Sequence, residues 1–164
     1  MPRILIVAYG NPMRSDDGVA WRAADALEAR LPSSVVEILR LHQLGPELAE
    51  TASRSEYVIF IDAAADPSCL PGEIRVVDVD PEDAAPSRFW HAVSPQTVIG
   101  LSESLYGVKL KAIVVTATGE NFDHGNTLSP AVSAAIPPLI DRIERIVRAF
   151  LHGKRNAPTT KDTL

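Results

Sequence analysis

The order of apolar and polar residues divides the chain into short apolar runs and longer stretches with helical spacing. The short runs predict five strands, which cover residues 3–9, 35–41, 57–62, 73–79 and 111–116. The first and third runs, ILIVAY and YVIFI, are almost free of polar residues. Such continuous runs are typical of parallel strands that are covered on both faces.

Helical spacing and helix-start signals predict four helices, at residues 16–30, 46–53, 94–105 and 129–151. Ser94 and Ser129 each precede a proline, which favours a capping residue followed by the first helical turn. A proline pair at 137–138 lies inside the last of these helices and predicts a kink there.

Strands that alternate with helices are typical of the α/β class. We therefore expect a single-domain, three-layer α/β/α sandwich built on a mainly parallel five-stranded sheet. The domain is expected to span residues 1–152, and the polar residues 153–164 are expected to form a flexible tail.

Composition and charge narrow the classes of function. The chain has 164 residues, of which 46% are hydrophobic, enough for one domain with a sizeable core. Its net charge is −5 and its Lys and Arg residues are scattered, which argues against a nucleic-acid partner. No apolar run reaches the roughly 20 residues that cross a bilayer, and no signal peptide is recognisable. The single Cys69 cannot form an internal disulfide and lacks neighbouring cysteines, which fits a cytoplasmic protein without a catalytic thiol.

Ligands of parallel α/β proteins collect at the carboxyl ends of the strands, where residues 10–18 read GNPMRSDDG. Helix capping by Ser15 or Asp16, which is worth about 1 kcal/mol, explains one part of this segment. A second adjacent acid gains less and suffers like-charge repulsion, so it needs solvent or a cation. The segment does not match GxGxxG or GxxxxGK[ST], and two aspartates would repel a phosphate.

Two further strand-end segments carry groups that bind metals. Asp62 ends an apolar strand, so its carboxylate must be hydrogen-bonded, paired or metal-bound; a loop or helix cap is the alternative. His91, in RFWHAVSPQTVI, is either a ligand or a structural hydrogen-bonding residue, and His42 and His124 are placed to rim a cleft. Two carboxylates and one imidazole from three loops form an incomplete shell that suits Ni, Zn or Fe.

Five segments of the chain resemble the hydrogenase maturation endopeptidases in order and spacing. They are ILIVAYGNPMRSDDGVAWRAADAL, LHQLGPELAE, YVIFIDAA, HAVSPQTVIGL and GNTLSPAVSAAIPPLI, and the resemblance extends to about Phe150. The resemblance implies a cytoplasmic endopeptidase that acts on the precursor of a [NiFe] hydrogenase large subunit. Such enzymes remove a C-terminal extension after nickel insertion, and the nickel of the substrate serves as the recognition element.

The resemblance also implies the site residues. Carried over by motif, the nickel-binding and catalytic set is Asp17 of DDG, Asp62 of FIDA and His91 of HAVSP. Zn or Cd is expected to substitute for nickel in vitro. Some family members carry Glu where Asp17 stands, and AYGN replaces a more glycine-rich entry to the loop; Ala20 likewise stands where a glycine is frequent.

The chemistry expected from these residues is metal-assisted peptide hydrolysis, because no serine or cysteine nucleophile motif is recognisable. Asp16 is expected to act as a cap rather than as a base. Three alternatives remain: a checkpoint protein that detects metal loading without cutting, an α/β module that binds an anion or nucleotide at GNPMRSDDG, and a metal-dependent hydrolase of another small peptide.

Overall fold

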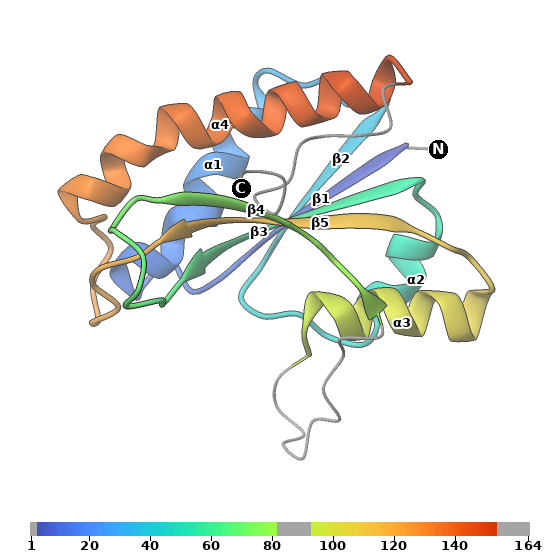
Figure 1. Cartoon of the computed structure of the whole chain (residues 1–164), viewed down its shortest axis with the longest axis horizontal. Coiled ribbons are helices and arrows are strands. Elements are labelled where there is room, and N and C mark those ends of the chain that lie inside the picture. Colours follow the sequence, from blue (N-terminus) through green and yellow to red (C-terminus); the bar gives the residue numbers. More distant parts are fainter. Residues whose placement is uncertain (1–2, 82–92, 154–164) are drawn as a thin grey trace.

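A computed structural model describes residues 3–81 and 93–153 of the chain. One mixed sheet lies between two helical layers, with α1 (Val19–Glu28) and α4 (Pro130–Leu151) on one face. Helices α2 (Leu48–Ser53) and α3 (Pro95–Tyr106) cover the other face (Figure 1). The predicted three-layer α/β/α sandwich is therefore confirmed.

The sheet has five strands in the order β2-β1-β3-β5-β4. Four of them are mutually parallel: β1 (Ile4–Tyr9), β2 (Val36–Leu41), β3 (Tyr57–Ala64) and β5 (Lys111–Thr118). The edge strand β4 (Ile74–Asp78) pairs with β5 in the antiparallel direction. The carboxyl ends of the parallel strands consequently lie along a single edge of the sheet.

Three predicted boundaries differ from the structure in ways that affect the site. The segment Ser15–Gly18 forms a 3-10 turn, η1, so α1 begins three residues later than the helical spacing predicted. Strands β3 and β5 each continue two residues further than predicted, which pairs Asp62 with Thr116 inside the sheet. Asp62 therefore lies within a strand rather than at its end.

Alternating residues of the central strands face the two helical layers. Ile6 and Ile59 pack in the cluster beneath α1 and α4, whereas Val7 and Phe60 pack in the cluster that contains Val98 of α3. All five side chains are fully buried. The continuous apolar runs are thus explained by coverage of both faces.

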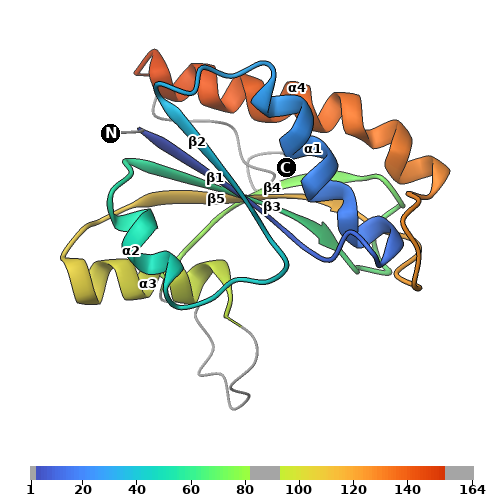
Figure 2. The ribbon, with the colours of Figure 1, turned by 180° about the vertical axis from the view of Figure 1, so that it is seen from behind.

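The layer formed by α2 and α3 covers only part of its face of the sheet. Figures 1 and 2 show both helices beneath the half of the sheet nearer the N-terminus, so the carboxyl ends of β1 and β3 extend beyond them. Asp62 shares this face with Phe60, because residues two apart in a strand point to the same side. The candidate site lies on this face of the sheet, beyond the two helices.

Within the described residues, no helix combines the length and the apolar character that crossing a membrane requires. The last helix, α4, runs uninterrupted through Pro137 and Pro138. The predicted tail, residues 153–164, lies outside the described residues from position 154 onward.

Candidate functional site

A pocket of about 230 Å³ opens at the carboxyl ends of β1 and β2, beside β3. Its walls come from the end of β1, from η1, from the segment after β2, from β3 and from the residue two positions before α3. The lining residues are Tyr9, Gly10, Asp17, His42, Gln43, Leu44, Asp62 and Val93. The structure therefore brings together Asp17 and Asp62, which the sequence placed in separate strand-end segments.

Asp17 is held against the end of β1 by a close backbone approach. Its Oδ2 atom accepts a hydrogen bond of 2.7 Å from the backbone N–H of Asn11. Gly10 has a φ of 145°, and a Cβ at this position would overlap the carbonyl oxygen of Asp17. Glycine at position 10 is thus required by both conformation and space.

Asp62 is half-buried and lines the pocket. Burial raises the pKa of its carboxyl group to about 6, and the negative charge of Asp17 acts in the same direction. Hydrogen bonds from the Tyr9 hydroxyl and the Ala63 backbone N–H oppose this rise. The sequence predicted that this carboxylate is hydrogen-bonded, paired or metal-bound, and hydrogen bonding is the alternative that these contacts support.

Tyr9 was not identified from the sequence, and the strand register of the structure places it beside Asp62. Ala8 pairs with Ile61 in the parallel β1–β3 ladder, so the next position along each strand brings Tyr9 beside Asp62. Burial, followed by the charge of Asp62, raises the pKa of Tyr9 well above its ordinary value. The phenol is therefore a hydrogen-bond donor.

Asp16 has a different role from its neighbour. Its side chain is fully buried and accepts hydrogen bonds from the backbone N–H groups of Glu120, Asn121 and Ser129 at 2.7–2.9 Å. The Ser129 hydroxyl donates a fourth, at 2.9 Å. Although burial alone would raise the pKa of Asp16, these hydrogen bonds lower it. Asp16 thus ties the loop after β5 and the start of α4 to the segment after β1.

The prediction that Ser15 or Asp16 caps the first helix is wrong. Neither η1 nor α1 has a side-chain cap at its N-terminus. The Ser15 hydroxyl donates instead to the carbonyl oxygen of Asp123, at 2.8 Å. Both residues bind a loop more than 100 positions away in sequence, an interaction that local helix-start signals do not describe.

The predicted caps of the later helices have different outcomes. The Ser94 side chain accepts a hydrogen bond from the backbone N–H of Thr97, which confirms its role at the start of α3. Ser129 occupies the N-cap position of α4, but its hydroxyl donates to Asp16 and caps no helical N–H.

Of the histidines, His42 lines the pocket, as the prediction of a cleft-rim residue allowed. Its ring lies edge-on to Trp21, with centroids 5.2 Å apart. His124 is not a lining residue of this pocket. His91 lies outside the described residues, and within those residues no three His, Cys, Asp or Glu side chains are grouped to hold a metal ion.

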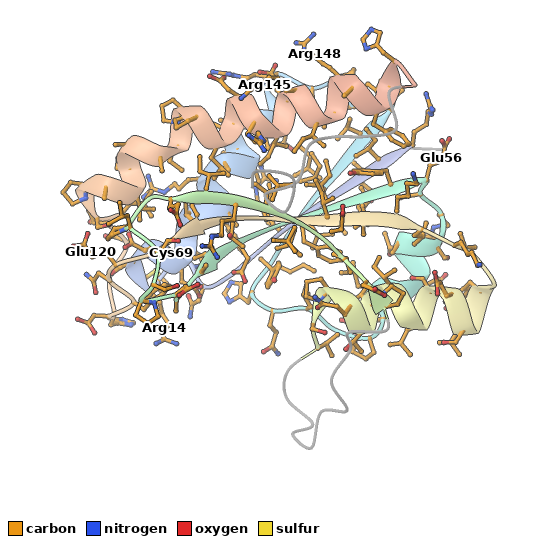
Figure 3. All side chains as sticks on the ribbon, viewed as in Figure 1. Arg14, Glu56, Cys69, Glu120, Arg145 and Arg148 are labelled. Atoms are coloured by element: carbon orange, nitrogen blue, oxygen red, sulfur yellow. The ribbon has the colours of Figure 1, made fainter. Side chains whose placement is uncertain are left out.

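Cys69 lies at the same end of the molecule as Arg14 and Glu120, as Figure 3 shows, but it does not line the pocket. The side chain of Glu73, together with burial, raises the pKa of the Cys69 thiol. A protonated thiol is a poor nucleophile, which agrees with the expectation that Cys69 is not catalytic.

No family model matches the chain. The chain is 27% identical over 154 residues to the hydrogenase 2 maturation protease of Escherichia coli strain K12, covering 89% of this chain and 91% of that protein. It is also 27% identical over 169 residues to the hydrogenase expression/formation protein HupD of Thiocapsa roseopersicina, covering 99% and 76%. The solved structure of the hydrogenase maturating endopeptidase HybD from E. coli matches with a TM-score of 0.69 and 26% identity, covering 89% and 92%. These matches in sequence and in structure support the hydrogenase maturation endopeptidase family for this chain.

Proposed function

We propose that this protein is an endopeptidase that removes the C-terminal extension of a [NiFe] hydrogenase large-subunit precursor after nickel insertion. The nickel already held by the precursor is the recognition element. The observation that carries the proposal is the convergence of Asp17 and Asp62 on one pocket, in a fold that matches HybD.

The donor set of the pocket suits a cation carried by the substrate. Two carboxylates lie close enough for Asp17 to raise the pKa of Asp62, so a positive charge between them relieves their repulsion. His91 would complete the set with an imidazole nitrogen, and Val93, two residues further along the chain, lines the same pocket. Carboxylate oxygens and imidazole nitrogens are suitable ligands for nickel.

Recognition through the substrate's own metal also explains the chemistry. Binding of the precursor's nickel to the two aspartates would fix the neighbouring peptide bond in the cleft, which favours attack by a positioned water. The metal is a Lewis acid that can polarise the scissile carbonyl or that water. Water adds to the carbonyl carbon, the C–N bond breaks, and the released amine takes up a proton. The proposal places this reaction in the cytoplasm, in keeping with the lone Cys69.

The experiment is incubation with nickel-loaded and nickel-free precursor, followed by intact-mass measurement. We expect loss of the extension only from the nickel-loaded form, with no loss when Asp62→Asn is used. Equal cleavage of both forms would overturn nickel recognition. Stable binding of the loaded precursor without a mass change would instead identify a checkpoint protein that does not cut.

A further inference from the structure

Tyr9 occupies a position between the core and the pocket. Its ring packs edge-on against Phe60 of the buried core, with centroids 6.5 Å apart and an interplanar angle of 87°. It lies beside Asp62 across the β1–β3 ladder, and both residues line the pocket together with Asp17. The ring is thus fixed from the core side while its polar end faces the candidate site.

The hydrogen bond between Tyr9 and Asp62 restricts the orientation of the Asp62 carboxylate. A phenol keeps its proton at neutral pH, so Tyr9 donates and Asp62 accepts. The Ala63 backbone N–H donates to the same carboxylate. A carboxylate held by two donors has a defined orientation, and its remaining lone pairs are left for a cation in the pocket.

We propose that Tyr9 is a positioning residue that orients the Asp62 carboxylate toward substrate-borne nickel. The inference rests on the proposed function, because it assigns Asp62 to nickel. When a residue that hydrogen-bonds to a metal-binding carboxylate is removed, the affinity for the metal typically falls by about 10- to 100-fold.

The test measures Ni²⁺ binding by calorimetry in Tyr9→Phe, which keeps the ring against Phe60 and removes only the hydroxyl. We expect affinity about 10- to 100-fold below wild type. The matched control is Tyr57→Phe at the opposite end of β3: Tyr57 also packs on a phenylalanine, Phe150, with centroids 4.7 Å apart. This control removes a similar hydroxyl far from the pocket and is expected to keep wild-type affinity.

A spectroscopic readout separates positioning from a general effect on stability. The chain has three tyrosines, so ¹³C labelling at Cζ gives three resonances that Tyr→Phe variants assign. Adding Cd²⁺, which is diamagnetic, should shift the Tyr9 resonance and leave those of Tyr57 and Tyr106 in place. In Asp62→Asn, the Tyr9 resonance should not respond to Cd²⁺.

The outcomes distinguish the two proposals. If Asp62→Asn weakens Ni²⁺ binding but Tyr9→Phe binds like wild type, the role of Tyr9 is overturned and the proposed function stands. If Asp62→Asn binds Ni²⁺ like wild type, the pocket is not the nickel site, and both nickel recognition and the role of Tyr9 are overturned.

Discussion

Asp16 and Asp17 are adjacent in the chain but belong to two different regions of the molecule. Asp16 is buried in the junction between the segment after β1 and the loop that leads into α4, where its carboxylate accepts four hydrogen bonds. Asp17 lines the pocket and, within residues 3–81 and 93–153, accepts one short hydrogen bond, from the backbone N–H of Asn11. The comparison separates an acid that the fold requires from an acid that is left available for a ligand.

The largest expected effect is on stability, from Asp16→Ala. Removing this carboxylate leaves three backbone N–H groups and one hydroxyl without their acceptor, at an expected cost of about 3–5 kcal/mol in the free energy of unfolding. Urea denaturation monitored by circular dichroism measures it. Asp17→Ala serves as the control and should cost about 1 kcal/mol or less. Equal losses in the two variants would remove the distinction between the two regions.

The second effect is on activity, from Asp17→Asn. We expect cleavage of nickel-loaded precursor to fall at least about 100-fold, or about 2.7 kcal/mol, because a neutral amide is a poor ligand for a cation. The midpoint of urea denaturation should stay within experimental error of wild type. Cleavage at the wild-type rate would show that Asp17 is not one of the residues that bind the nickel of the precursor.

The third effect is on the pH dependence of the free energy of unfolding. The contributions of Asp62 and Asp16 to this dependence should have opposite signs. Asp62 has a folded-state pKa of about 6, above its value in the unfolded chain, so its contribution to stability is present below about pH 4 and is lost as the pH rises through 6. About 3 kcal/mol is expected over this range, and Asp62→Asn should abolish the loss. Asp16 has a lowered pKa, so its contribution is present above about pH 4 and is lost as the pH falls further. Unfolding curves from pH 3 to 8 for both Asn variants measure the two slopes.

The smallest effect is stabilisation by added cation. Ni²⁺ at ten times its dissociation constant should stabilise the wild type by about 1.4 kcal/mol, seen as a rise in Tm. Asp16 lies in the other region, so a variant such as Asp16→Asn, although less stable, should show the same increment. Asp62→Asn should show none. An equal increment in Asp62→Asn would place the bound cation elsewhere.

Much of the fold follows from local pattern. Strands buried on both faces leave long apolar runs, and Ser-Pro pairs mark the starts of α3 and α4, so the sheet and its layers were predictable. The carboxyl end of β3 was less predictable, because Asp62 interrupts the apolar run while the backbone ladder to β5 continues to Ala64. The predicted strand therefore ended at the polar residue Asp62, whereas the backbone hydrogen bonds of the real strand continue beyond it.

The site was predictable as a location and only in part as a set of residues. Parallel topology brings strand ends together, which placed Asp17 and Asp62 at the same edge. The role of Asp16 was not predictable from local signals, because its partner Ser129 is 113 positions away in sequence. The contact of Tyr9 with Asp62 depends on register between β1 and β3, which the runs of apolar residues do not specify.

The most direct test of the central claim is a crystal soaked with Ni²⁺ and measured at the nickel absorption edge. The account predicts one anomalous peak in the pocket within ligand distance of Asp17 and Asp62, with His91 as the third ligand. It also predicts no peak beside Asp16. A peak elsewhere on the molecule, with none between the two aspartates, would contradict the account.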